Sequence, residues 1–177
     1  MPEFEAVRER EAEPTVSFYE QTLREREILR DRLANSPVVM RRKDAPVDPS
    51  RQGHLTYLLQ PELFEEGKAC VPDWHMFIHT IHTSADGITT SGQHRHQGGL
   101  GLFAIEGEGY TVVDGVRYDW KAGDFIMLPI KPNGCVHQHF SRRPGEAAKW
   151  LAVIYDPYMT ITGAAFEQRK DGAKVHA

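Results

Sequence analysis

Two pairs of histidines in this sequence have the spacing of metal ligands on a β-strand. One residue separates His94 from His96, and one residue separates His137 from His139. Side chains at positions i and i+2 of a strand point to the same face, so each pair would present two imidazoles together. A single H-x-H pair is weak evidence in a chain with nine histidines. The two pairs would form one site if a closed sheet brought them together.

The elements that must position these histidines are short strands. After Trp74 the sequence changes to alternating or briefly apolar runs that are bounded by turns. Asp114-Gly115 is a residue pair that a two-residue type I′ hairpin favours, because both positions need a positive φ. We therefore predict an all-β sandwich or barrel over residues 74–156. Its strands are expected at WHMFIHTIHT, LGLFAIEG, YTVVDG, VRYDW, DFIMLP, VHQHF and KWLAVIYD.

The remaining segments are expected to be accessory. Residues 1–37 combine a charged start with one amphipathic helix that stops before Pro37, and its narrow apolar strip suits packing on the outside of the domain or against another subunit. Residues 38–73 contain several prolines and predict an irregular lead-in with a short strand at 54–60. Residues 157–177 are interpreted as a tail.

Composition excludes several classes of protein. The chain has 177 residues, is 40% hydrophobic and has no apolar run near the about 20 residues of a membrane span, so we expect a globular protein without a membrane partner. The net charge of -4 without a basic block argues against nucleic acid. The acidic start lacks the pattern of a secretory signal, which favours a cytoplasmic location. Cys70 and Cys135 are expected to be free thiols.

The histidines and the glycines around them resemble the two motifs of the cupin superfamily, G-x5-H-x-H-x3,4-E-x6-G and G-x5-P-x-G-x2-H-x3-N. The matching positions run in order through residues 74–156 and are His94, His96, Gly107, Gly123, Pro129, Gly134 and His137. The resemblance implies a cupin double-stranded β-helix, or jelly-roll barrel, with the added N-terminal α-helix. It also implies that His94, His96 and His137 ligate a divalent metal ion.

The sequence departs from the cupin motifs at three places. Leu100 stands where the motif has its glutamate, four residues separate Pro129 from Gly134 where one is usual, and Ser141 replaces the final asparagine. The cupin gentisate 1,2-dioxygenases also lack the glutamate and bind iron through three histidines, and this barrel is similar to theirs. Those enzymes generally contain two barrels, so the similarity does not identify a substrate.

The resemblance and the residue types together predict a mononuclear centre. Three neutral imidazoles leave a divalent ion its full +2 charge, which favours an anionic, chelating substrate. His139 is the candidate acid or base, with a fourth ligand and a packed core residue as the other interpretations. We place Leu100, Leu102 and Gln97 in the substrate pocket, although the two leucines would equally fill a barrel core and Gln97 points away unless the strand bulges. Arg95 and Lys131 are expected to face solvent.

Three interpretations of function remain open at this stage. The leading one is an Fe(II) dioxygenase that uses O2 on a small anionic substrate, aromatic or β-diketone-like. The second is a lyase, isomerase or hydrolase that uses Zn, Ni or Mn as a Lewis acid. The third is a barrel that binds a small ligand without catalysis. In each of them the exposed sheet edges and the helix favour a homodimer.

Overall fold

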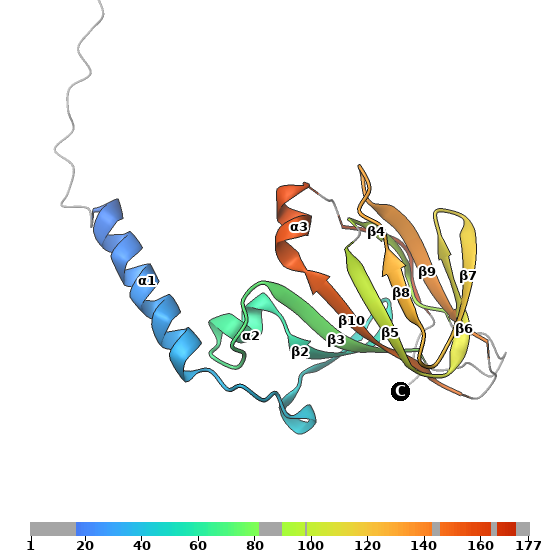
Figure 1. Cartoon of the computed structure of the whole chain (residues 1–177), viewed down its shortest axis with the longest axis horizontal. Helices are drawn as coiled ribbons and strands as arrows, with labels where there is room; N and C mark the ends of the chain where they lie inside the picture. Colours follow the sequence, from blue (N-terminus) through green and yellow to red (C-terminus); the bar gives the residue numbers. More distant parts are fainter. Residues whose placement is uncertain (1–16, 82–89, 98, 143–145, 164–165, 173–177) are drawn as a thin grey trace, which may run out of the picture.

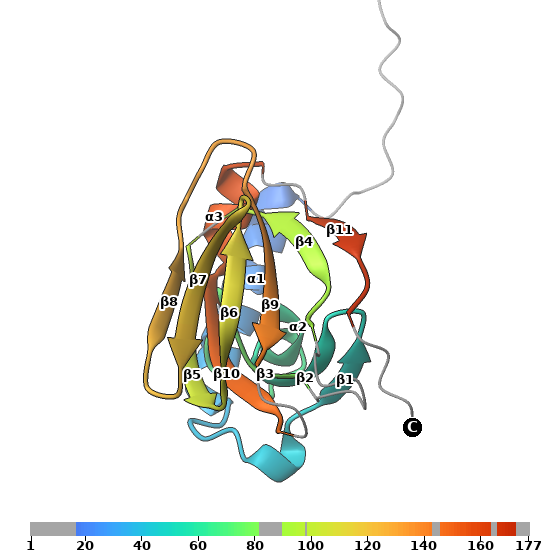
Figure 2. The same cartoon turned by 90° about the vertical axis from the view of Figure 1, so that its right-hand side faces the viewer.

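The fold consists of two antiparallel β-sheets that face each other (Figures 1 and 2). The computed structural model describes residues 17–81, 90–97, 99–142, 146–163 and 166–172. The six-stranded sheet has the order β1-β2-β3-β10-β5-β8, and the five-stranded sheet has the order β11-β4-β9-β6-β7. The predicted all-β jelly-roll barrel with an N-terminal helix is confirmed. The strands of the first sheet are β1 (Val47–Ser50), β2 (Gly53–Leu59), β3 (Trp74–Ile81), β10 (Ala148–Tyr155), β5 (Leu100–Glu106) and β8 (Phe125–Leu128); those of the second are β11 (Glu167–Lys170), β4 (Gln93–His96), β9 (Cys135–Ser141), β6 (Glu108–Val113) and β7 (Val116–Lys121).

The core lies between the two sheets because residues alternate strictly along the central strands. In β9 and β10 every second residue is buried, beginning with the first residue of each strand. Trp150 is fully buried at 0% exposure and packs against Trp120 with ring centroids 5.3 Å apart. Truncation of such an aromatic side chain to alanine typically costs about 3–5 kcal/mol. Burial of one face of each strand therefore fixes which histidines point inward.

The hairpin between β6 and β7 has the predicted turn. Asp114 has φ 48° and Gly115 has φ 85°, the two positive values that a type I′ turn requires. The turn matters for the site because the Asp114 carboxylate also accepts a hydrogen bond from the backbone N–H of Val136, at 2.8 Å. One end of the hairpin is thereby attached to the start of β9.

Both sheets extend beyond the segment 74–156. The predicted short strand at 54–60 is β2, which pairs with β3, and β1 pairs with β2 at the edge of the sheet. Helix α2 (Pro61–Glu65) follows β2 and buries Leu63 and Phe64. After β10 the chain forms α3 (Asp156–Ile161) and then β11, which pairs with β4. The five-stranded sheet therefore ends in a strand from the far end of the chain.

Helix α1 (Phe18–Asn35) projects from the body of the molecule (Figure 1). Ser17 caps its start, where the side chain accepts a hydrogen bond from the backbone N–H of Glu20, and the helix ends before Pro37 as predicted. None of its residues is buried. Packing of this helix on the described part of its own chain is therefore not observed. The helices of the described ranges also include none with the length and apolar character of a membrane span.

Candidate metal centre

Neighbouring strands of the five-stranded sheet bring three predicted ligands together. In the antiparallel pairing of β4 with β9, His94 lies opposite His137 and His96 lies opposite Cys135. The side chains of all three histidines are buried, and one ring nitrogen from each lies within 4.8 Å of the others. The ring centroids of His94 and His96 are 4.1 and 4.8 Å from that of His137. Such a cluster of imidazoles can hold one metal ion.

Backbone carbonyls orient the three imidazoles for ligation. The Nδ1 of His94 lies 3.0 Å from the carbonyl oxygen of Gly92, that of His96 lies 2.5 Å from the Gln97 oxygen, and that of His137 lies 3.2 Å from the Cys135 oxygen. A carbonyl only accepts, so each Nδ1 donates and each Nε2 keeps a free lone pair.

The Nε2 atom of His137 gives the most direct indication of a ligand. It is buried and has no hydrogen-bond partner. A buried acceptor without a partner costs roughly 1–3 kcal/mol, which a bound cation would recover. The donor set of three neutral nitrogens also suits a divalent transition metal, so the residues present fit the predicted group.

Burial keeps these imidazoles in the neutral form that a metal requires. Desolvation, followed by the effect of His96, lowers the pKa of His94 to about 3. Desolvation also lowers the pKa of His96, and together with His94 and His96 it holds that of His137 well below the usual value. Protons therefore compete weakly for the three nitrogens near neutral pH.

A cavity of about 300 Å³ adjoins the histidine cluster. Leu100, Leu102 and His139 line it. The other described residues of its wall are Gln52, Leu55, Tyr57, Gln60, Glu62, His75, Phe77, His79, His94, His96, Ile154, Met159 and Phe166.

Gln97 is not among the described residues of this wall, and its assignment to the substrate pocket stays a prediction. Its side chain is buried, and its Oε1 accepts a hydrogen bond of 2.8 Å from the backbone N–H of Lys131. This bond joins the end of β4 to the loop between β8 and β9. The Gln97 side chain thus stabilises the connection between Pro129 and Gly134, which is longer than in the cupin motif.

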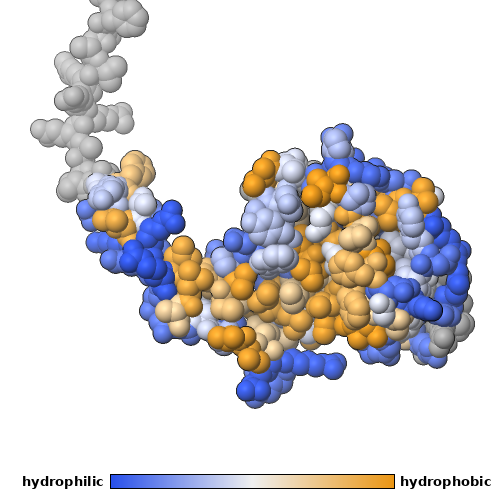
Figure 3. Space-filling view, in the orientation of Figure 1, coloured by the Kyte–Doolittle hydropathy of each residue, from blue (hydrophilic) through white to orange (hydrophobic). Residues whose placement is uncertain are grey.

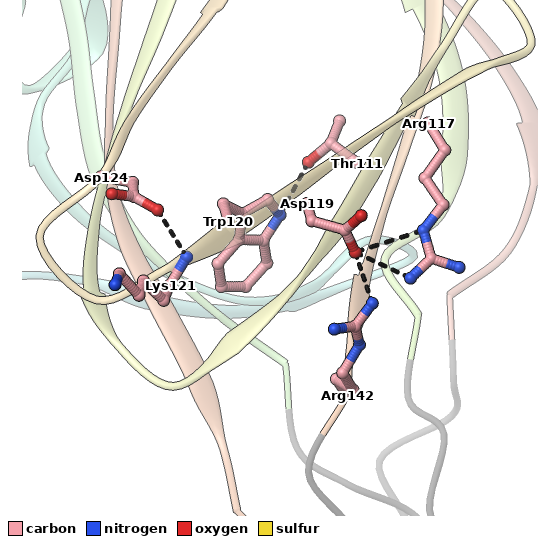
Figure 4. A network of polar contacts seen from close by, with 7 residues as sticks. All are labelled: Thr111, Arg117, Asp119, Trp120, Lys121, Asp124 and Arg142. Atoms are coloured by element: carbon pink, nitrogen blue, oxygen red, sulfur yellow. Dashed lines mark hydrogen bonds and ion pairs between the residues drawn. The ribbon is translucent and has the colours of Figure 1, made fainter.

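Thr111 contacts the ring of His139, and Trp120 in turn is hydrogen-bonded to Thr111. Its Nδ1 lies 2.8 Å from the hydroxyl oxygen of Thr111, and the same oxygen accepts a hydrogen bond of 3.0 Å from the indole N–H of Trp120. Figure 4 shows Thr111 and Trp120 beside the ion pairs that Asp119 makes with Arg117 and Arg142. Nδ1 of His139 thus faces Thr111, and the His139 ring lines the cavity.

The two basic residues near the site are both paired rather than free in solvent. Arg95 lies 2.8 Å from the carboxylate of Glu167 on β11, and its side chain is only 35% exposed. Arg95 therefore keeps part of its side chain in solvent, and its ion pair with Glu167 follows from the pairing of β11 with β4, which the sequence did not indicate. Lys131 is more exposed, but its Nζ lies 2.7 Å from the Asp114 carboxylate. A hydrogen bond from Lys131 is the main cause of a lowered pKa of Asp114.

Sequence analysis missed one residue of the site and left two others undecided. Phe166 stacks on His94 and His96, with centroids 5.6 and 5.8 Å away, and is 54% exposed. Nothing in the local sequence indicates this contact. His75 and His79 occupy alternate positions of β3 and both line the cavity, so strand alternation could have identified them. His82 lies outside the described residues.

Comparisons with known proteins agree with this fold. A family model described as "Cupin domain" matches residues 81–154. A salicylate 1,2-dioxygenase variant from Pseudoaminobacter salicylatoxidans, in complex with gentisate, superposes with a TM-score of 0.53 and 20% identity over 94% of this chain and 52% of that one. The salicylate 1,2-dioxygenase reported from Pseudaminobacter salicylatoxidans gives a TM-score of 0.50 and 22% identity over 70% and 33% of the two chains.

The present chain thus spans between a third and about half of these larger structures. At this level of identity the similarity concerns the fold. No curated protein matches the sequence significantly. The segment matched by the family model carries β4 to β10 and all three clustered histidines. Residues 81–154 therefore match the cupin domain model, and this part of the barrel carries a candidate three-histidine metal centre on β4 and β9.

Proposed function

We propose that this protein is a mononuclear metal-dependent cupin enzyme, and that it is an Fe(II) dioxygenase of a small anionic, aromatic or β-diketone-like substrate. The proposal depends chiefly on three buried imidazoles beside a cavity, with one ring nitrogen of each within 4.8 Å of the others. When bound there, the ion would supply a +2 charge and open positions for substrate and O2. In support, the similar structures include a salicylate 1,2-dioxygenase in complex with gentisate.

The protein side chains would orient the substrate and exclude water. Leu100 and Leu102, at 4% and 1% exposure, form an apolar wall next to the ligands. Because Leu100 occupies the usual carboxylate position, the ligand set carries no charge of its own, so the cation attracts an anionic oxygen more strongly. Phe166 covers the faces of two ligand rings and limits access from that side.

The test is reconstitution of the metal-free protein with Fe(II) under anaerobic conditions. We expect one iron per chain and O2 uptake with gentisate, salicylate, hydroxynaphthoate or a β-diketone. His96→Ala should lose both, because it removes one of three ligands. The matched variant His54→Ala, on β2 and outside the described cavity wall, should retain both. Iron bound in stoichiometric amount without O2 uptake for any of these compounds would refute the dioxygenase assignment.

A non-oxidative metalloenzyme is the second candidate, because the three histidine ligands are also compatible with it. Three neutral histidine nitrogens also suit Zn(II), which can act as a Lewis acid on a carbonyl or hydroxyl group. Metal analysis of freshly purified protein separates the two functions. Iron, with activity that declines in air, supports the oxygenase. Zinc, nickel or manganese with activity that is stable in air supports the Lewis-acid enzyme.

We also propose that two copies associate through the outer face of the six-stranded sheet and α1. The alternation that turns Leu100 and Leu102 inward turns Phe103 and Ile105 outward, and these are 45% and 46% exposed. Figure 3 shows hydrophobic side chains over the region of β10 and β5 and along part of α1. Most of the stability of a helix in a protein comes from packing of its apolar face, so this 18-residue helix without buried residues gains from a partner. Outward apolar residues of the same face include Trp74, Phe125 and Met127.

A further inference from the structure

Two cavity histidines remain after the metal ligands are assigned. His79 on β3 and His139 on β9 are 3% and 2% exposed, and both line the cavity. Their ring centroids are 6.3 Å apart in an edge-to-face arrangement. Each also packs against Trp150, at 5.0 and 5.1 Å. Strands from opposite sheets thus bring two buried imidazoles together beside the metal centre.

Hydrogen bonding fixes which nitrogen of His139 carries its hydrogen. Thr111 is fully buried, and its hydroxyl oxygen already accepts a hydrogen bond from Trp120. The Thr111 hydrogen needs an acceptor, because an unsatisfied buried donor costs about 1–3 kcal/mol. His139 Nδ1 at 2.8 Å is the acceptor that the described contacts offer. His139 therefore carries its hydrogen on Nε2 and presents an N–H donor to the cavity.

His79 has the opposite polarity toward the cavity. Its Nε2 lies 2.6 Å from the carbonyl oxygen of Gln52, which can only accept, so Nε2 carries the hydrogen. Burial lowers the pKa of His79 to about 4, which keeps the ring neutral near pH 7. Its Nδ1 is then a bare acceptor. The pair offers one donor and one acceptor. Thr111 positions the ring of His139, and the carbonyl group of Gln52, a residue of the cavity wall, positions the ring of His79.

A hydroxyl group complements this pair, because one oxygen can accept a hydrogen bond while its hydrogen is donated. A carboxylate has no hydrogen to give to His79, and its lone pairs would face the Nδ1 lone pair. The carboxylate of Glu62 on the same wall adds repulsion. The cavity of about 300 Å³ lies at the lower end of the usual size of ligand pockets and suits a single ring.

We propose that His79 and His139 form a recognition site for a neutral hydroxyl group on the substrate. His139 Nε2 donates to the hydroxyl oxygen, and the hydroxyl hydrogen is donated to His79 Nδ1. This inference rests on the proposed function and narrows its substrate class. The anionic oxygens of the substrate belong at the metal, and the further polar group on its ring is a hydroxyl, not a second carboxylate.

Binding of small probes to the metal-free protein tests the site separately from metal chemistry. The probes are phenol, toluene and benzoate at pH 8, which have similar size and differ in the polar group. Quenching of tryptophan fluorescence provides the signal, because Trp150 contacts both histidines. We expect phenol to bind at least about tenfold more tightly than toluene or benzoate, the equivalent of two modest hydrogen bonds.

Two variants assign this preference to the histidine pair. His79→Phe keeps a ring but removes the acceptor, and should abolish the advantage of phenol over toluene. Thr111→Val removes the donor that sets the position of the hydrogen on His139, and should reduce the advantage of phenol over toluene severalfold. This variant replaces His79→Phe as the test if His79→Phe folds poorly. His54→Phe should leave it unchanged. Equal binding of phenol and toluene to the wild type, or an unchanged preference in His79→Phe with native circular dichroism, would overturn the proposal. If the wild type prefers phenol as expected but binds no metal ion, only the proposed function is overturned.

Discussion

The neutral, buried His79 should make the metal-free protein sensitive to acid. Its pKa is about 4 in the folded state, and the reference value for an imidazole is 6.5. The unfolded chain therefore binds a proton at His79 between these values while the folded chain does not. The contribution of His79 to stability is fully present above pH 6.5 and is lost as the pH falls toward 4.

The size of this effect follows from the two pKa values. Between pH 8 and pH 5 the linkage relation gives a loss of about 2 kcal/mol in the free energy of unfolding from His79 alone. The ring is deeply buried and packs against His139, Phe77 and Trp150, so solvent screening reduces the value little. His79→Phe removes the titrating group and keeps an aromatic ring in its place.

Urea unfolding at pH 8 and pH 5 measures this contribution in both proteins. EDTA treatment is required, because metal binding also depends on pH. At pH 8 the variant should be about 1–3 kcal/mol less stable, since the Gln52 carbonyl loses its donor. On acidification the wild type should lose about 2 kcal/mol more than the variant. The remaining histidines are common to both proteins, and the comparison also includes the small effect of His79 on the pKa of His94 and His139. Equal losses, within about 0.5 kcal/mol, would refute a neutral buried His79.

Two further predictions concern the metal centre and the assembly. Asp114→Ala removes the carboxylate that attaches the hairpin to Lys131 and to the start of the strand carrying His137. Metal affinity, measured by competition with a chelator, should therefore fall about tenfold. An unchanged affinity would contradict this role of Asp114. Leu33→Glu places a charge on the apolar strip of α1 and should shift the protein from dimer to monomer. Size-exclusion chromatography with light scattering measures this shift. A wild-type protein that is monomeric would contradict the proposed pairing.

Local patterns predicted the parts of the site that lie on regular strands. Alternation placed Leu100, Leu102 and His139 toward the interior, and all three line the cavity. The spacing of the histidines and the resemblance to the cupin motifs together indicated that His94 and His137 would meet, and the pairing of β4 with β9 places them opposite each other. A period-two pattern shows which side chains of a strand point to the interior, and this does not require knowing which strand it pairs with.

Contacts that depend on the pairing of distant elements could not be predicted. Phe166 reaches the ligand rings only because β11 pairs with β4, and that strand has little apolar character. The same pairing brings Glu167 to Arg95. The hydrogen bond between Gln97 and the loop at Lys131 could not be predicted either, because the path of that loop is a tertiary property.

The position of β11 has a practical consequence for handling this protein. It is the outermost strand of its sheet, and it separates β4 from solvent. A truncation before Glu167 would leave the backbone amides and carbonyls of β4 without neighbours on one side. An uncovered strand of this kind recruits other chains and promotes aggregation. Expression vectors should therefore retain the residues through Lys170, and an affinity tag is better separated from them by a flexible spacer.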